Sequence, residues 1–327
     1  MSYSKLIPLL QKKGSSLTPE QFQERVNIVF HNHEAIHYDQ MHTDMKESLQ
    51  EQIDLLVSDI QKSTTPTKPL KMLDIGCGTG LSSQMLLNSS LGKHVQSVTL
   101  LDTSPGMLQK AAEKAKTWNV NYELKNGYLS YVNDTFDVVL ICSVLHHIPD
   151  LNGFLKQLDA VLNSDGILIH LQDPNSDYLH DAKLLARAKR YADATKNKSK
   201  IAKTPASIIP KSVRKWIKKL IGRKDYIDLI NDQLLLEKVI TKRMTADEIW
   251  SVTDIQIEMD KGEENGGISY AFLQEQLVNF QPVSHRSYGF FGLLKSDLSA
   301  EFKIEEADCI ASNQLNGRNL SAAWIKK

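Results

Sequence analysis

The chain has 327 residues, of which 41% are hydrophobic and 24% charged, and its 39 lysines and arginines balance 39 aspartates and glutamates. This length can bury one large core or two modest ones, and the zero net charge indicates no particular partner. There is no run of 18 apolar residues and no signal-peptide core, so we expect a soluble, cytoplasmic protein. Cys77, Cys142 and Cys309 fit no metal-site spacing and are expected to be reduced thiols.

Residues 19–61 have the pattern of two helices and contain an H-E-x-x-H sequence that runs from His33 to His37. On a helix, both histidines would lie on one face as zinc ligands, with Glu34 as a base. A zinc enzyme of this kind also needs a third ligand at helix spacing downstream, and His42 is too close for that arrangement. We therefore predict no metal site, because short motifs recur by chance in a histidine-rich stretch.

A short apolar run over residues 70–75 predicts a buried strand, and it is followed by three alternate glycines, Gly76, Gly78 and Gly80. Residues 81–87 then predict the start of a helix. Alternate glycines let the backbone turn tightly against a ligand, and the helix start offers unpaired N–H groups to an anionic group. The spacing is G-x-G-x-G and not the G-x-G-x-x-G of the dinucleotide fingerprint, which disfavours NAD as the ligand.

A second apolar run, over residues 95–102, ends in an acid, Asp102, which lies 22 residues after Gly80. A carboxylate at the end of a second strand can accept both hydroxyls of a ribose, as the acid about 20 residues after the glycines does in nucleotide-binding folds. Ser104 and Pro105 are the predicted N-cap and first residue of the next helix. The alternative, in which Asp102 only forms a turn, stays open.

Two further strands are predicted over residues 121–125 and 136–142. The second is mostly apolar and rich in β-branched residues, which is typical of a central parallel strand. It is followed by Leu-His-His-Ile-Pro-Asp. Because ligands in open α/β sheets lie at the carboxyl ends of the strands, we expect His146 and His147 at the rim of the site. A structural role for one of them, as a cap of Asp150 or of the next helix, is the alternative.

Residues 151–162 have the spacing of a core-facing helix, and residues 167–171 that of a fifth strand. Five strand-plus-helix units in alternation predict a parallel, doubly wound sheet. From residue 173 to about residue 265 the pattern is helical only. The sheet pattern then returns with a helix and two strands, over residues 266–273, 283–292 and 322–327.

Part of the helical region is strongly basic, since residues 196–224 hold eleven lysines or arginines and no acid. Its segment 211–221 has the pattern of an amphipathic helix. Such a helix can lie on an anionic membrane or meet an acidic substrate. We favour the alternative in which the apolar stripe packs on the core, because amphipathic helices of soluble proteins usually face the core, so peripheral membrane contact is not the favoured interpretation.

Three stretches together resemble one enzyme family. Residues 73–80 resemble motif I of the class I S-adenosylmethionine-dependent methyltransferases, and residues 35–39 resemble the A-x-x-Y-D helix upstream of it. The His-His-Ile-Pro-Asp sequence resembles the fourth-strand end of the ubiquinone- and menaquinone-type members. The resemblance implies an α/β fold with a doubly wound, mostly parallel seven-stranded sheet, whose last strand is antiparallel. The expected parts are N-terminal helices, a Rossmann-like core and a helical lid inserted after the fifth strand, over residues 1–65, 66–175 with 266–327, and 176–265.

The resemblance also implies which residues form the site. Motif I would hold the methionine end of S-adenosylmethionine, and Asp102 its ribose. The expected cofactor contacts are Tyr38, Asp74, Gly76, Gly78, Gly80, Asp102, Thr103, Met107, Asn126, Gly127, Tyr128, Cys142 and Ser143. Asn126 departs from the family pattern, in which an acid usually contacts the adenine amino group. The residues expected near the substrate are Asp173, Tyr178, Tyr270, His285 and Arg286.

We therefore expect methyl transfer to oxygen, nitrogen or carbon of a small molecule, as in quinone-like or secondary-metabolite biosynthesis. The sulfonium carbon is already activated, so the protein mainly aligns the acceptor and excludes water. A hydroxyl acceptor also has to lose its proton, for which we expect His147 as base or orienting group, with His146 structural.

Two alternatives stay open: a protein that binds S-adenosylmethionine without methyl transfer, and an enzyme that uses it for another reaction. Nucleic acid is not an expected partner. The fourth strand is not followed by the N-P-P-Y-like tetrapeptide of amino-group DNA methyltransferases.

Overall fold

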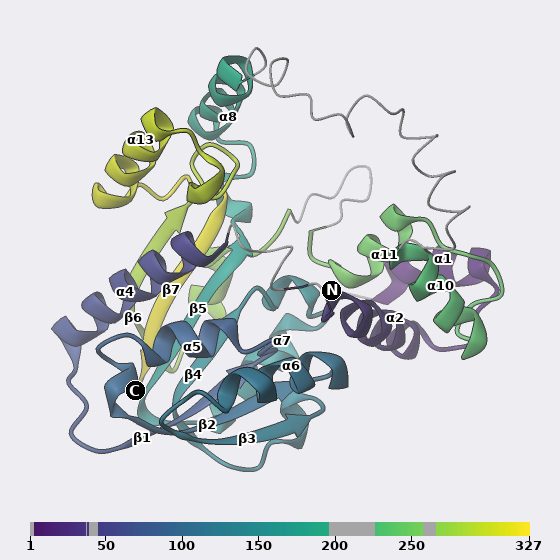
Figure 1. Ribbon diagram of the computed structural model, residues 1–327, viewed down its shortest axis with the longest axis horizontal. Coiled ribbons are helices and arrows are strands. Elements are labelled where there is room, and N and C mark those ends of the chain that lie inside the picture. Colours follow the sequence, from purple (N-terminus) through teal and green to yellow (C-terminus); the bar gives the residue numbers. More distant parts are fainter. Residues whose placement is uncertain (1–2, 37, 39–44, 196–225, 258–265) are drawn as a thin grey trace.

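The computed structural model describes residues 3–36, 38, 45–195, 226–257 and 266–327. Seven strands form one sheet in the order β3-β2-β1-β4-β5-β7-β6, in which β7 is antiparallel to both neighbours and the other pairs are parallel (Figure 1). The strands are β1 (Leu70–Ile75), β2 (Val95–Asp102), β3 (Asn121–Asn126), β4 (Phe136–Cys142), β5 (Leu162–Pro174), β6 (Phe280–Tyr288) and β7 (Asn319–Lys326). This arrangement confirms the predicted doubly wound sheet with an antiparallel last strand.

Helices precede the sheet, alternate with its strands and follow β5. In the described residues they are α1 (Ile7–Lys13), α2 (Pro19–Glu34), α4 (Met45–Ser63), α5 (Leu81–Leu87), α6 (Pro105–Ala115), α7 (Leu151–Val161), α8 (Ala182–Thr195), α10 (Tyr226–Leu236), α11 (Ala246–Thr253), α12 (Tyr270–Gln276) and α13 (Ala300–Ala311). No helix in this part of the chain is long and apolar enough to cross a membrane. The basic segment 196–224, with its expected helix 211–221, lies outside the described residues.

Three predicted strands differ from the observed ones by more than one residue at their ends. The fifth strand, expected over residues 167–171, runs from Leu162 to Pro174. The sixth strand, expected over residues 283–292, begins at Phe280 and ends at Tyr288, because Gly289 has a left-handed φ of +76° and turns the chain. The final strand begins at Asn319, three residues before the expected start. Gln281 and Pro282 interrupt the apolar pattern near the start of the sixth strand, and Asn319 and Ser321 do so in the final strand, so the apolar pattern alone placed both starts too late.

The central strands are buried on both faces. Successive side chains of a strand point to opposite faces, so Met72 and Leu140 belong to the core shared with α4, α5 and α6, whereas Leu73 and Val139 belong to the core shared with α7. All four side chains are fully buried. Burial on both faces explains the continuous apolar runs that marked these strands in the sequence.

A separate core joins the N-terminal helices to the helices inserted after β5. Phe22 and Val26 of α2 pack with Leu234 of α10 and Ile249 of α11, and all four side chains are fully buried. Figure 1 shows α1, α2, α10 and α11 grouped together at one side of the sheet. The two segments are therefore one packed unit, although about 200 residues separate them in the sequence.

A pair of leucines on α10 tests this packing, since Leu234 is fully buried and Leu236 is 82% exposed. Leu234→Ala should lower the free energy of unfolding by about 3–5 kcal/mol, through lost apolar burial and the cavity left behind. Leu236→Ala should change it by less than about 0.5 kcal/mol. Urea unfolding followed by circular dichroism measures both values. Equal effects of the two substitutions would contradict the docking of α10 on α2.

Candidate active site

A cavity of about 1120 Å³ lies at the carboxyl ends of β1, β2 and β4. The ends of these strands supply one wall, which includes Gly76, Asp102 and His147. The helices α2 and α11 supply much of the rest, including His31 and Trp250. Drug-sized ligands occupy cavities of roughly 300–1,000 Å³, so this space suits a nucleotide-sized molecule together with a second small one.

The loop after β1 follows the cavity wall closely because of two glycines with left-handed backbones. Gly76 has a φ of +63°, and a Cβ there would lie 2.5 Å from Cγ2 of Val144. Gly78 has a φ of +52°, lines the cavity, and would place a Cβ in open space. The first glycine thus permits close packing behind the loop, and the second leaves bare backbone facing the cavity.

Asp102 ties this loop to the following turn. Its Oδ2 accepts a hydrogen bond from the backbone N–H of Gly78 at 2.9 Å, and its Oδ1 accepts one from the N–H of Ser104 at 2.8 Å. Burial raises the pKa of Asp102. The two hydrogen-bond donors act in the opposite direction, because they stabilise its charged form. Each carboxylate oxygen keeps a lone pair, so the group fits a pair of ribose hydroxyls.

His146 lines the cavity and is held by a buried carboxylate. Asp173 Oδ1 accepts hydrogen bonds from the Nδ1–H of His146 at 2.6 Å and from its backbone N–H at 3.1 Å. Burial lowers the pKa of His146, as does the neighbouring His147. Burial raises the pKa of Asp173, but its hydrogen bonds with His146 and His170 outweigh this and hold that pKa well below its ordinary value. The lowered pKa favours a neutral ring, and Asp173 holds both the ring and the backbone N–H of His146, which supports the predicted structural role.

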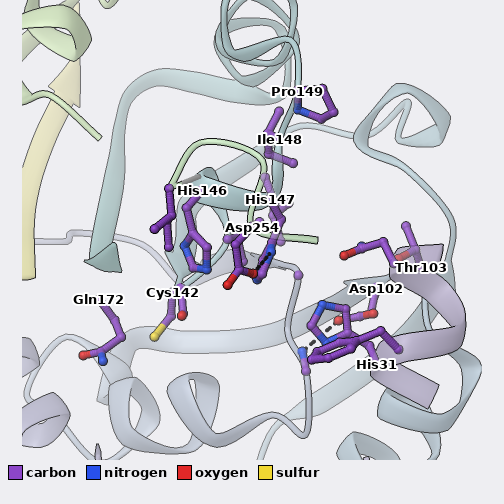
Figure 2. Close-up of a pocket in the computed structure, with 18 of the residues that line it drawn as sticks. His31, Asp102, Thr103, Cys142, His146, His147, Ile148, Pro149, Gln172 and Asp254 are labelled. Carbon is purple, nitrogen blue, oxygen red and sulfur yellow. Dashed lines mark hydrogen bonds and ion pairs between the residues drawn. The ribbon is translucent and has the colours of Figure 1, made fainter. Parts of the chain in front are cut away.

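His147 is held from the inserted region. Its Nδ1 lies 2.9 Å from the carbonyl oxygen of Thr253 and 3.3 Å from Oδ1 of Asp254. Figure 2 shows the His147 and Asp254 side chains next to one another, with His146 beside them and His31 on the side toward Asp102. Burial lowers the pKa of His147, but hydrogen bonding to Asp254 and its charge outweigh burial and raise that pKa above its ordinary value.

The fold and this strand-end geometry agree with comparisons to known proteins. A methyltransferase domain family matches residues 73–168. The chain is 34% identical over 111 residues to a ubiquinone biosynthesis O-methyltransferase of Azorhizobium caulinodans, covering 33% of this chain and 42% of that protein. It is 33% identical over 100 residues to a demethylmenaquinone methyltransferase of Tropheryma whipplei, covering 30% and 40% of the two chains. Residues 73–168 therefore carry a methyltransferase domain that is distantly related to those of ubiquinone and menaquinone methyltransferases.

The family match runs from β1 into β5. The chain spans about two fifths of the length of these curated relatives. Among solved structures, it is similar to the plantazolicin methyltransferase BpumL in complex with S-adenosylhomocysteine, with a TM-score of 0.42 and 14% identity over 94% of this chain and 98% of that one. The inserted helices, β6 and β7 lie outside the family match.

Most of the predicted cofactor residues line the cavity, and three do not. Asp74 is fully buried below the loop, where its Oδ2 accepts hydrogen bonds from the hydroxyls of Ser82 and Ser83, and burial raises its pKa to about 7. Gly80 is the N-cap of α5, and the exposed Asn126 donates to the carbonyl of Asp102. The lining residues are Tyr38, Gly76, Gly78, Asp102, Thr103, Met107, Gly127, Tyr128, Cys142 and Ser143.

The residues expected near the substrate lie elsewhere in the described structure. Asp173 is under His146, and Arg286 forms an ion pair of 2.7 Å with Asp59 of α4. Tyr270 stacks on His285 with ring centroids 3.5 Å apart, and burial lowers the pKa of His285 to about 4. Together with Tyr178, these five residues are absent from the described cavity wall. Much of the cavity wall beyond the strand ends is built from α2 and α11 instead.

Four residues of that wall were missed in the sequence. His31 and Glu34 are three positions apart on α2, and their side chains form a contact of 3.0 Å. Their helical spacing within the histidine-rich stretch is a signal that could have found them. Trp250 and Asp254 had no such local signal, because they reach the cavity only through the packing of α11.

The alternative zinc motif has another explanation in the structure. The helix α2 ends at Glu34, and Nε2 of His33 is 2.7 Å from Oε1 of Gln233 on α10, while His37 lies outside the described residues. Elsewhere, His146, His147 and Asp254 offer nitrogen and oxygen atoms within 4.8 Å of one another. The hydrogen bonds given above account for that grouping without an ion.

The two glycines give a matched test of the loop. Both substitutions place alanine in a left-handed backbone, which costs about 1–2 kcal/mol. Gly76→Ala should add a packing penalty of about 1–3 kcal/mol against Val144. Gly78→Ala should instead put a methyl group into the cavity and weaken S-adenosylhomocysteine binding, on the order of tenfold or about 1.4 kcal/mol. Thermal unfolding and calorimetry measure the two effects, and identical profiles for both variants would contradict the geometry.

Proposed function

We propose that this protein transfers a methyl group from S-adenosylmethionine to a small-molecule acceptor. One observation carries the proposal: a single cavity joins the glycine loop and Asp102 to His147. The first two features suit the nucleoside and amino-acid parts of the cofactor, and the third can receive a proton. The enclosure of the cavity by α2 and α11 favours a small acceptor over a polymer.

Different residues of the chain have separate roles in this reaction. The backbone of Gly78 leaves room for the methionine end of the cofactor, and the carboxylate of Asp102 accepts its ribose hydroxyls. S-adenosylmethionine supplies a methyl group already activated by the positive sulfur. The surrounding helices hold the acceptor in line and exclude water, which is the main catalytic contribution for such a displacement. His147 takes the proton where the acceptor is a hydroxyl.

The relatives leave the acceptor atom open, because their names specify an oxygen of a ubiquinone precursor in one case and demethylmenaquinone in another. We infer a hydroxyl, amine or carbon acceptor of similar size for this chain. The alternatives are cofactor binding without transfer and another reaction of the same cofactor. The cavity wall on the acceptor side, with His147 in it, favours transfer over simple binding.

The Asp102 carboxylate provides the direct test of the cofactor site. Asp102→Ala should weaken S-adenosylhomocysteine binding by about 2–4 kcal/mol, because a charged acceptor of two hydroxyl hydrogen bonds is lost. Isothermal titration calorimetry measures the change. Asp134→Ala removes an acid that is exposed and outside the cavity, and it should leave the affinity unchanged. Equal affinities of wild type and Asp102→Ala for S-adenosylhomocysteine would contradict the assignment of the cofactor site.

Methyl transfer itself is tested with labelled S-adenosylmethionine and four acceptor probes: 3,4-dihydroxybenzoate, 1,4-dihydroxy-2-naphthoate, octanoate and N,N-dimethylglycine. With an acceptor that is methylated, His147→Ala should reduce turnover about 10²–10⁴-fold, as loss of a general base does. Its affinity for S-adenosylhomocysteine should stay unchanged, and the exposed His94→Ala should behave as wild type. Near-normal turnover of His147→Ala would mean that alignment alone suffices.

A further inference from the structure

The inserted region returns to the sheet through a segment, residues 253–257, that lies against the end of β4. The backbone N–H of Gln256 donates to the carbonyl of His146 at 3.0 Å, and its side-chain amide donates to the carbonyl of Ile148 at 2.6 Å. Gln256 is buried, so these bonds are shielded from water. The segment is therefore fastened on both sides of His147 and brings Thr253 and Asp254 to its ring.

The contact with Thr253 fixes which nitrogen of His147 carries a proton. A carbonyl oxygen can only accept, so Nδ1, at 2.9 Å from the Thr253 oxygen, must be the donor. The neutral ring then has its lone pair on Nε2. In the described part of the chain, no group forms a hydrogen bond with this Nε2, and His147 lines the cavity. The ring is thus arranged as a base toward the space where an acceptor would bind.

Asp254 is itself held in place. Its Oδ1, 3.3 Å from Nδ1 of His147, also accepts a hydrogen bond of 3.2 Å from the hydroxyl of the fully buried Thr253. Its backbone N–H donates to the carbonyl of Trp250 at 2.7 Å, at the end of α11. A carboxylate fixed at this distance would stabilise a positive charge that forms on the imidazole ring.

We infer that Asp254 is a positioning residue for His147 and that the acceptor reacts through a hydroxyl group. This inference rests on the proposed function. The hydroxyl oxygen forms a bond to the methyl carbon while the carbon–sulfur bond breaks, and the electron pair of that bond leaves with sulfur as a neutral thioether. The hydroxyl proton moves to Nε2 of His147. Nδ1 of the resulting imidazolium faces the Asp254 carboxylate. The inserted region thus supplies the negative charge that stabilises the protonated base.

Other titratable groups near His147 also affect its pKa. His146 lies beside it, with ring centroids 3.9 Å apart, and the His31 ring of α2 meets it edge-on at 5.2 Å. A positive charge on His147 lowers the pKa of His146, whereas Asp173 of β5 and Asp102 of β2 favour a positive charge on His147 at longer range. Asp254 is the carboxylate in contact with the ring, so its removal should lower the pKa of His147.

The first test needs no acceptor. An NMR titration of the histidine rings, with the His147 signal assigned from a His147→Gln variant, compares wild type with Asp254→Asn. The pKa of His147 should fall by about one unit or more in Asp254→Asn. Asp254→Glu should restore part of the shift, and Asp228→Asn, which removes an exposed acid of α10, should leave it unchanged. An unchanged His147 pKa in Asp254→Asn would overturn the inference.

The second test measures turnover against pH with 3,4-dihydroxybenzoate. Wild-type kcat should rise with pH through the pKa of His147, because the neutral ring is the base. Asp254→Asn should shift this rise to lower pH and reduce the plateau roughly 10- to 100-fold, without a change in S-adenosylhomocysteine affinity. Methylation of octanoate alone among the probes would overturn the hydroxyl acceptor, since an ionised carboxylate has no proton to lose.

The outcomes separate this inference from the proposed function. If wild type transfers methyl groups and His147→Ala is impaired but Asp254→Asn is not, only the role of Asp254 is wrong. If wild type methylates none of the probes, the NMR titration still decides the coupling of Asp254 to His147. Elemental analysis that finds a stoichiometric metal ion, lost in Asp254→Asn, would show Asp254 to be a ligand and would also overturn the inference.

Discussion

The carboxylate of Asp102 is the point at which the parts of this site are joined. It holds the N–H of Gly78 on one side and that of Ser104 on the other. The hydroxyl of Ser104 and the N–H of Gly106 in turn meet Oδ1 of Asn32 on α2, at 2.7 and 3.0 Å. The position of α2 over the cavity thus depends on the same turn that orders the glycine loop.

This connection continues from α2 to the inserted helices. Phe22 and Leu234 lie in one core, so α10 and α11 are positioned relative to the sheet partly through α2. Asp254, at the end of α11, contacts His147, and Gln256 is hydrogen-bonded to the turn that follows β4. The walls of the cavity are therefore coupled by contiguous packing and hydrogen bonds, which is a physical basis for mutual effects of cofactor and acceptor.

The sequence contained enough to predict the sheet and part of the wall of the candidate cavity. Gly76, Gly78 and Asp102 are recognisable because their chemistry depends on local backbone geometry, which short-range spacing determines. The acceptor side was not recognisable in the same way. Asp254 follows an ordinary helix end, and only tertiary packing brings it to His147, 107 residues earlier in the chain.

The residues expected near the substrate lie away from the described cavity wall for a related reason. Arg286 of the sixth strand was expected near the substrate. The structure shows that β6 is the edge strand beyond β7, where Arg286 meets Asp59 of α4. His285 stacks on Tyr270 at the same edge. A strand pattern gives the alternation of faces, but which element covers each face depends on the whole topology.

The core shared by α2 and the inserted helices also has a consequence for biosynthesis. Phe22 emerges from the ribosome long before Leu234, and at about 5–20 residues per second the roughly 200 residues between them take about 10–40 s to synthesise. During that interval the apolar face of α2 has no partner from the inserted helices. The nascent N-terminal helices are thus a segment that chaperones can bind, and their docking closes a long loop late in folding.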